Sequence, residues 1–407
     1  MGEGRGEGRT TARRDTAMAH RDIDVVAAGH ICVDITPSFG EVSGTSLAEI
    51  LRPGGLLQVG PATISTGGTV SNTGLALRRL GLNVSLMGKC GDDLFGQAIL
   101  DILRREAPGA EAGMRVVPGE RTSYTIVIVL PGIDRMFFHC PGCNDTFGAE
   151  DVDMDIVRQA RLFHFGYPPA MKRMYSSGGR ELATLLRKVS GVGTGTSLDL
   201  TLPDPNTEAG RADWPAILSE ALPYTDIFLP SLEELLFMLR RERFEELIAG
   251  PGIVNAFTAD DLRALAGDCL GMGARIVVIK CGHAGAYLRT AASLDNLSEV
   301  LNVTQEWEGV EMFEPTCKVE HIVSAAGSGD NAIAGFLAAF LHGEPPAWCM
   351  AVLAAVGAQN LSVVDTISGV LSWEETIAQV QANPEKNPLP ERLASAFGVG
   401  DLAKPGQ

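Results

Sequence analysis

The second half of the chain alternates between strand-like and helix-like segments, and this alternation restricts the fold more than any other feature of the sequence. Short apolar runs typical of buried strands occur at 162–166, 197–200, 226–229 and 276–281. Segments with helical spacing of apolar residues lie between them, at 180–189, 214–222, 231–240 and 259–270. Such alternation predicts an α/β fold in three layers, with a mostly parallel sheet covered by helices on both faces.

Two segments of the N-terminal half predict further β structure. Residues 24–29 form a short apolar run that ends in glycine and predict a buried first strand. Residues 124–130 and 135–139 flank a Pro-Gly turn and predict a β-hairpin. The glycine-rich segment 191–195 precedes a predicted strand, whereas a dinucleotide fingerprint follows one, so the sequence argues against a dinucleotide-dependent oxidoreductase.

Composition excludes several classes of partner. The formal net charge of −17 over 407 residues argues against nucleic acid and against an anionic membrane surface. No uninterrupted apolar stretch approaches the roughly 18–20 residues that span a bilayer. The eight cysteines are scattered through the chain, which is typical of reduced thiols and predicts a cytoplasmic protein.

The segment 321–341 combines a glycine turn with a helix. Gly327 and Gly329 allow a tight turn, and the apolar residues after it follow helical spacing. Unpaired backbone amides and the positive end of a helix dipole suit an anion such as a phosphate. Asp330 stands at this position, where a carboxylate is suited to accept a proton from an attacking hydroxyl. The alternative is that Asp330 is simply the N-cap of the helix.

These residues resemble the C-terminal signature of the ribokinase-like (PfkB) carbohydrate kinases. That family has Gly-Ala-Gly-Asp where this chain has residues 327–330, and 334–337 continue the match. The resemblance implies that Asp330 is the catalytic base and that the amides around Gly327, Ser328 and Gly329 form the anion hole. It covers about residues 22–385, and it implies a ribokinase-like fold with a small β-sheet lid.

Two segments of the N-terminal half resemble the parts of the same family that bind the phosphate acceptor. Asp34 ends a Gly-x-x-x-x-Asp segment that begins at residue 29, and Gly67, Gly68 and Asn72 match a Gly-Gly-x-x-x-Asn pattern. The resemblance implies that Asp34 binds sugar hydroxyls and that the other three residues contact the phosphate acceptor. Without the resemblance, Asp34 reads as a solvent-exposed residue at the end of a strand.

Two further segments resemble, more weakly, the parts of the family that bind the nucleotide and its metal ion. Ser231 and Glu234 resemble the family's Asn-x-x-Glu element, which implies that Glu234 holds Mg²⁺ through water. A serine N-cap with glutamate three residues later is also a complete capping box, so a structural role explains both residues equally well. Lys280, Gly282 and Gly285 resemble the Thr-x-Gly-x-x-Gly nucleotide turn, which implies ATP binding.

Departures from the family pattern leave the substrate open. Residues 324–326 read Ser-Ala-Ala instead of Asp-Thr-Thr, which argues against activation by a monovalent cation. Ser324 is similar to the phosphosugar kinase branch, whereas Asp34 and the segment 67–72 resemble ribokinases, fructokinases and nucleoside kinases. A phosphosugar site would need several basic residues, and Lys89 and Arg135 are the only obvious candidates in the sequence. We therefore favour ATP-dependent phosphorylation of a non-phosphorylated sugar. The alternatives are a nucleoside or phosphosugar kinase and a non-catalytic homologue that binds a sugar or nucleotide.

The predicted organisation is one catalytic domain with a short extension at each end. Residues 1–21 predict a disordered leader, 22–385 a ribokinase-like kinase domain, and 386–407 a tail. Parts of 35–66 and 113–140 are expected to form the β lid. The expected partners are a small-molecule sugar and ATP, with neither nucleic acid nor membrane, and the family also suggests a homodimer through the lid.

Overall fold

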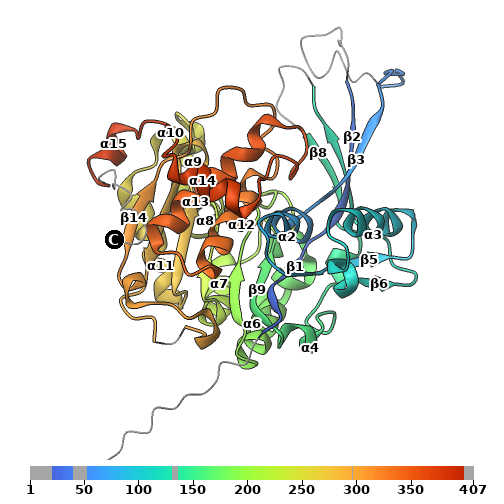
Figure 1. The fold of residues 1–407 in the computed structure, drawn as a ribbon. Helices are drawn as coiled ribbons and strands as arrows, with labels where there is room; N and C mark the ends of the chain where they lie inside the picture. Colours follow the sequence, from blue (N-terminus) through green and yellow to red (C-terminus); the bar gives the residue numbers. More distant parts are fainter. Residues whose placement is uncertain (1–20, 40–52, 131–135, 296, 398–407) are drawn as a thin grey trace, which may run out of the picture.

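A computed structural model describes residues 21–39, 53–130, 136–295 and 297–397. Within these residues, eight strands form a large sheet in the order β14-β13-β12-β11-β10-β9-β1-β4 (Figure 1). Their bounds are β1 (Ile23–Gly29), β4 (Val84–Met87), β9 (Ala160–Gly166), β10 (Gly195–Leu198), β11 (Ile227–Phe228), β12 (Ile276–Lys280), β13 (Ala286–Thr290) and β14 (Glu311–Glu314). The strands from β4 to β12 pair in parallel, and β13 and β14 complete the sheet as an antiparallel edge.

Helices cover both faces of this sheet, which confirms the predicted three-layer fold. One face carries α6 (Arg180–Gly191), α7 (Trp214–Ala221), α8 (Leu232–Leu239) and α11 (Ala259–Met272). The other face carries α2 (Thr69–Arg79), α12 (Ser328–Leu341) and α13 (Pro346–Gln359). Alternate residues of β1 enter the two cores, because Val25 packs in one cluster and Val26 in the other.

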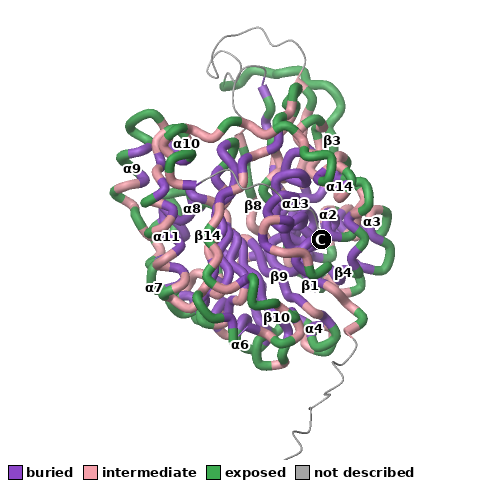
Figure 2. Tube along the Cα trace, turned by 60° about the vertical axis from the view of Figure 1, so that its left-hand side comes forward, coloured by how far each residue is buried: buried purple, intermediate pink, exposed green. Residues whose placement is uncertain are grey.

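Helix α12 is buried more completely than the sequence predicts. Its apolar spacing predicts one apolar face, yet every residue from Asp330 to Leu341 is buried. The helix packs against both α2 and α13, so two faces meet other helices. Figure 2 shows the buried stretch of chain at α13 in purple. Gly335 allows this close packing, since a Cβ there would lie 2.8 Å from the Cβ of Val356.

A second, four-stranded sheet projects from the body in Figure 1, in the order β3-β2-β7-β8. Its bounds are β2 (Cys32–Pro37), β3 (Ala62–Gly67), β7 (Tyr124–Ile128) and β8 (Met136–Cys140). Strands β7 and β8 form the predicted hairpin. Only His30 and Ile31 separate β1 of the main sheet from β2, so this two-residue link joins the projecting sheet to the body.

The remaining elements surround these two sheets. They are β5 (Lys89–Gly91), β6 (Arg115–Val117), α3 (Leu94–Glu106), α4 (Met154–Val157), α5 (Lys172–Tyr175), α9 (Arg241–Ala249), α10 (Ile253–Ala256), α14 (Trp373–Gln381) and α15 (Glu391–Ala394), with short 3-10 turns between them. None of the helices in the described part is both long and apolar enough to cross a bilayer.

The two predicted end segments differ in how far they are described. Residues 1–20 of the predicted leader and 398–407 of the predicted tail lie outside the described residues. The first part of the predicted tail packs on the body, because Leu393 and Phe397 are buried in the core that includes α11. Residues 290–320, which carry no strong pattern in the sequence, supply the edge strand β14.

Candidate active site

Polar side chains gather where the parallel strands of the main sheet end. Tyr167 directly follows β9, Asp199 directly follows β10, and Lys280 is the last residue of β12. The first turn of α12, at residues 327–330, faces the same edge. The carboxyl ends of parallel strands are where open α/β sheets bind ligands. The ends of β9, β10 and β12 and the start of α12 therefore meet at the position expected for a ligand-binding site.

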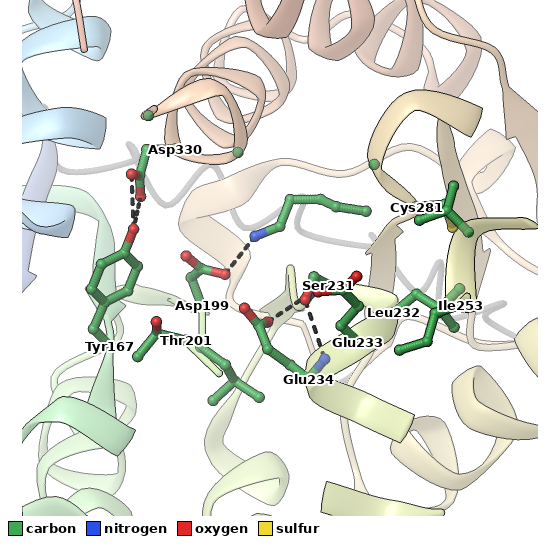
Figure 3. A pocket seen from close by; sticks show the side chains of 16 residues that line it. Tyr167, Asp199, Thr201, Ser231, Leu232, Glu233, Glu234, Ile253, Cys281 and Asp330 are labelled. Atoms are coloured by element: carbon green, nitrogen blue, oxygen red, sulfur yellow. Dashed lines mark hydrogen bonds and ion pairs between the residues drawn. The ribbon is translucent and has the colours of Figure 1, made fainter. Parts of the chain in front are cut away.

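These residues line one cavity of about 310 Å³. Figure 3 shows Tyr167 pointing toward Asp330 on one side and the Ser231–Glu234 turn on the other, with Asp199 between them. The predicted residues that the cavity brings together are Ser231, Glu234, Lys280, Gly282, Gly327, Gly329 and Asp330. The site thus combines segments that are far apart in the sequence.

Asp330 is a buried carboxyl group with several hydrogen-bond donors. The Tyr167 hydroxyl lies 3.0 Å from Oδ1 and 2.8 Å from Oδ2, and the Asn72 amide donates to Oδ2 at 2.9 Å. The Thr73 hydroxyl lies 3.4 Å from Oδ1. Burial raises the pKa of Asp330, and the hydrogen bonds from Asn72 and Tyr167 oppose that rise. The carboxyl group is therefore prepared to take up a proton.

The alternative that Asp330 caps α12 is wrong. The N-cap position is held by Gly327, which has a left-handed φ of 71°, and no side chain caps the helix there. Asp330 lies in the first turn of the helix, three residues after Gly327, and its carboxylate points to Tyr167. The Ser328 amide donates to the Ala325 carbonyl oxygen at 3.3 Å, but no side chain accepts a hydrogen bond at the cap, which leaves this turn open to an anion.

Lys280 and Asp199 form a buried ion pair inside the cavity. The Lys280 ammonium donates to Asp199 Oδ1 at 2.6 Å and to the Leu229 carbonyl oxygen at 2.7 Å. Burial acts to lower the pKa of Lys280, but the carboxylates of Asp199 and Glu234 outweigh it and raise the pKa. Burial raises the pKa of Asp199, and the charge of Lys280 opposes that rise. One cation thus faces several acidic groups.

Ser231 and Glu234 form the capping box that the sequence predicts. The Ser231 hydroxyl accepts from the Glu234 amide at 3.2 Å, and Glu234 Oε2 accepts from the Ser231 amide at 2.7 Å. Glu234 is also buried and lines the cavity. Its structural role and its position in the site therefore coexist.

A second cavity of about 440 Å³ adjoins the first. It shares Lys280, Gly282 and Gly329 with the first cavity, so the two meet at the start of α12. The predicted residues Gly285 and Ser328 also line it. Its apolar wall consists of Val319, Ile322, Ala325, Ala332, Leu353, Ala354, Ala358 and Leu361.

The predicted acceptor residues fall into two groups. Asn72 contacts Asp330, whereas Asp34, Gly67 and Gly68 line neither cavity. Asp34 lies on β2 and accepts from the Cys32 thiol at 3.2 Å. A Cβ on residue 67 would lie 2.2 Å from Asp34 Oδ2, so glycine at this position leaves room for the carboxylate.

Sequence reasoning missed Tyr167, Asp199 and Thr73. Tyr167 directly follows the predicted strand at 162–166, and Asp199 lies near the end of the predicted strand at 197–200. A polar residue at the carboxyl end of a parallel strand is the signal that would have found both. Thr73 follows Asn72 in the segment already singled out, but no pattern in the sequence indicates that its hydroxyl meets Asp330.

Comparison with known proteins identifies related sequences over most of the chain. The model of the family described as pfkB family carbohydrate kinase matches residues 31–373. Fructokinase-2 of Oryza sativa is 28% identical over 225 residues, which cover 54% of this chain and 62% of the relative. Fructokinase-2 of Solanum lycopersicum is 33% identical over 144 residues, which cover 35% and 40%. The alignments therefore span between two fifths and about three fifths of these curated relatives.

Solved structures with the same fold cover more of the chain. A ribokinase of Arabidopsis thaliana, complexed with ribose and ATP, has a TM-score of 0.65 at 16% identity, with 88% of this chain and 99% of that chain covered. A fructokinase of Xylella fastidiosa with bound ATP has a TM-score of 0.64 at 18% identity, with coverage of 88% and 98%. At these low sequence identities, the similarity to the two solved structures establishes the fold alone.

Proposed function

Because the chain belongs to the pfkB family of carbohydrate kinases, we propose that it transfers the terminal phosphoryl group of ATP to a hydroxyl group of a sugar. The observation that carries this proposal is the position of Asp330, a buried carboxyl group that lines the first cavity at the start of α12, next to the point where the two cavities meet. One cavity would hold the polyphosphate, and its apolar neighbour along α13 would hold the adenine ring.

Each residue around Asp330 has a role in this transfer. Asp330 accepts the proton of the attacking hydroxyl, while the bonds from Tyr167 and Asn72 orient its carboxylate. The amides of residues 327–330 stabilise negative charge on the transferring group, because Gly327, Gly329 and Asp330 line the cavity at the helix N-terminus. Positioning and electrostatics supply most of the catalysis in phosphoryl transfer.

The charge of the cavity fits a divalent cation. Asp199, Glu233, Glu234 and Asp330 line it, and Lys280 is the basic residue among its lining residues. A polyanionic nucleotide needs further positive charge there, and carboxylates with water are the ligands that Mg²⁺ prefers. Magnesium, held through water by Glu234, would neutralise charge on the phosphates. Since 324–326 offer no carboxylate, we expect no potassium activation.

We propose that the acceptor is a non-phosphorylated sugar. Lys89, one of the two basic candidates for a phosphosugar, is buried and paired with Glu120 at 2.9 Å and Asp151 at 3.7 Å. The other candidate, Arg135, lies outside the described residues. The curated relatives named as fructokinases support a hexose as the first acceptor to test.

The test is ADP formation across a panel of fructose, ribose, a nucleoside and fructose 6-phosphate. We expect turnover on a non-phosphorylated sugar, and a loss of about 10²–10⁴-fold in kcat for Asp330→Asn. Calorimetry on the same variant should still detect ATP binding. Sugar binding without ADP formation on any acceptor would instead establish a non-catalytic homologue, and turnover of Asp330→Asn at the wild-type rate would refute the proposed base.

We also propose a homodimer through the projecting sheet. Ile64 and Phe138 are 56% exposed, and they align across the sheet through Ile35 and Ile126. Covering such a row is a common reason for association. Sedimentation should give a dimer for the wild type and a monomer for Phe138→Ser, and a monomeric wild type would refute this. The eight free cysteines support a reducing, cytoplasmic location.

A further inference from the structure

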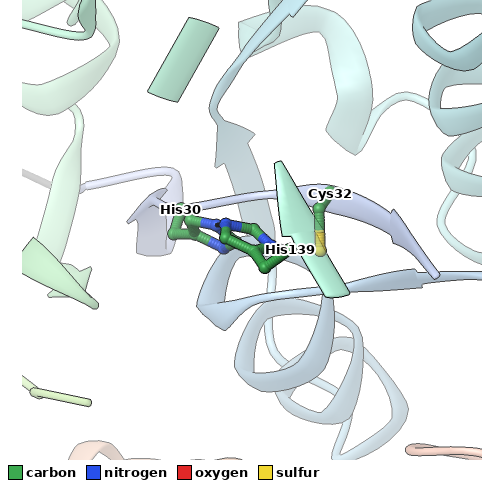
Figure 4. Close-up of side chains that lie close together, drawn as sticks. All are labelled: His30, Cys32 and His139. Atoms are coloured by element: carbon green, nitrogen blue, oxygen red, sulfur yellow. Dashed lines mark hydrogen bonds between the residues drawn. The ribbon is translucent and has the colours of Figure 1, made fainter. Parts of the chain in front are cut away.

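Two histidines and a cysteine lie together where the projecting sheet joins the body. His30 belongs to the two-residue link between β1 and β2, Cys32 begins β2, and His139 comes from β8 (Figure 4). His30 and Cys32 are buried, while His139 remains accessible to solvent. The proposed reaction uses none of these three side chains.

The spacing of the two histidine nitrogens matches a tetrahedral metal site, and the Cys32 sulfur lies close to both. The Nε2 atoms of His30 and His139 lie 3.3 Å apart, and one ligand atom from each of the three residues lies within 4.8 Å of the others. Zinc binds histidine nitrogen at about 2.0–2.1 Å, so tetrahedral geometry places two such nitrogens about 3.3 Å apart. Histidine and cysteine are also the ligand types that zinc prefers.

Neighbouring groups orient the histidine on β8. The Thr125 hydroxyl lies 3.0 Å from His139 Nδ1, so a proton on Nδ1 leaves Nε2 free to bind a metal. An imidazole must be neutral to bind a metal, and this hydrogen bond at Nδ1 favours the tautomer of His139 that presents Nε2.

We propose that His30, Cys32 and His139 bind a zinc ion, with water in the fourth position. The thiol of Cys32, which donates to Asp34 Oδ1 at 3.2 Å, loses its proton to solvent when it binds the metal. The bound metal would join β8 to the link at His30 and so fix the projecting sheet against the body.

The site is close to the proposed catalytic group. The His30 ring centroid lies 6.0 Å from that of Tyr167, whose hydroxyl donates to Asp330. Asp34, the predicted ligand of the sugar, lies beside Cys32. An ion bound here would therefore lie next to the residues proposed to bind the sugar. Zinc is expected to raise the apparent KM for the sugar without changing the KM for ATP.

The competing explanation is a hydrogen bond between two neutral imidazoles, with no affinity for metal. The full chain, freed of metal with a chelator, should be titrated with Zn²⁺ in competition with a chromophoric chelator. We expect one ion per chain, and about 100-fold or more weaker binding for His139→Ala and for Cys32→Ser. Cys140→Ser is the matched control, because it changes the adjacent thiol on β8 and should bind as the wild type does.

A second measurement identifies the ligands directly. Co²⁺ in place of zinc should give the visible bands of a tetrahedral site and a thiolate-to-cobalt band in the near ultraviolet, and Cys32→Ser should remove the latter. Circular dichroism of each variant establishes that it is folded. Equal zinc affinity for the wild type and His139→Ala, or a cobalt spectrum without a thiolate band, would overturn the proposal. Kinase activity enters neither measurement, so the outcome is independent of the proposed function.

Discussion

The Tyr167 hydroxyl bridges both carboxylate oxygens of Asp330, at 3.0 Å from Oδ1 and 2.8 Å from Oδ2. Tyr167 directly follows β9 and has a left-handed φ of 66°, a conformation that non-glycine residues rarely adopt. Such conformations persist where the surrounding structure enforces them, and they cluster at functional sites. The end of β9 thereby positions the side chain that orients the proposed base.

Replacing Tyr167 by phenylalanine tests this relationship. The variant removes a hydrogen bond to a buried carboxylate, worth about 1.5–3 kcal/mol, and so disfavours the ionised form of Asp330. The pKa of Asp330, already raised by burial, rises further, which corresponds to about 1–2 pH units. We expect the acid limb of the kcat/KM profile to move to higher pH by that amount.

Tyr175→Phe is the matched control for this change. Tyr175 lies in α5 and packs against the Trp214 ring, and it lines neither cavity of the site. Its variant should keep the wild-type pH profile. If Tyr167→Phe also kept that profile, the bond to Asp330 would be structural only.

The strands and helices that build the site were predictable from local patterns. The run at 162–166 and the helix at 180–189 differ from β9 and α6 by only two residues at an end. Buried parallel strands are continuously apolar and the helices between them are amphipathic, so both signals are local. The glycine turn at 327–330 was predictable for the same reason.

Contacts between distant segments were not predictable in this way. Asp330 meets Tyr167 across 163 positions and Asn72 across 258, and periodicity carries no information about such pairs. The pairing of His30 with His139 depends on how the projecting sheet folds back on the link after β1. Burial of α12 on several sides likewise depends on α2 and α13, which local spacing cannot report.

His164 on β9 should make stability depend on pH. Its Nδ1 lies 2.8 Å from the Ser197 hydroxyl, and burial, followed by the charge of Lys280, lowers its pKa from 6.5 to about 3. Between pH 6.5 and about pH 3, His164 therefore binds a proton in the unfolded chain but not in the folded chain. The stabilisation by neutral His164 is complete above pH 6.5 and is lost as the pH falls below that value.

The variant His164→Gln lacks this titration. The difference in unfolding free energy between wild type and variant should shrink by about 1.4 kcal/mol for each pH unit below 6.5. Urea unfolding at pH 7.5, 6.5 and 5.5 measures that difference. A difference that stays constant with pH would show that His164 takes up its proton equally in both states.

Gly329→Ala separates stability from activity at the start of α12. A Cβ there would lie no closer than 3.9 Å to another side chain, so the packing tolerates it and alanine favours the helix by about 0.5–1 kcal/mol. The methyl group would nevertheless enter the region where the two cavities meet. We expect thermal stability to be kept or raised and the KM for ATP to rise by about tenfold.

Gly267→Ala in α11 is the control for that substitution. Its Cβ would make an ordinary contact at 3.6 Å with Arg289, and the residue lines neither cavity. It should gain similar stability with no change in KM for ATP. An unchanged KM in Gly329→Ala would refute the proposed path of the nucleotide past residue 329.

A comparison of the two capping boxes built from serine and glutamate in the described residues separates the proposed metal role of Glu234 from its structural role. Glu234 accepts from the Ser231 amide at 2.7 Å, and Glu375 of α14 accepts from the Ser372 amide at 3.0 Å, but only the former lines the site cavity. Glutamine also forms a capping box, so both Glu→Gln variants should lose little stability. Glu234→Gln removes a negative charge next to the proposed magnesium position, and the Mg²⁺ concentration for half-maximal activity should rise about tenfold, while Glu375→Gln leaves it unchanged. Equal magnesium dependence in the two variants would refute the proposed metal role of Glu234 and leave it with a structural role in the capping box alone.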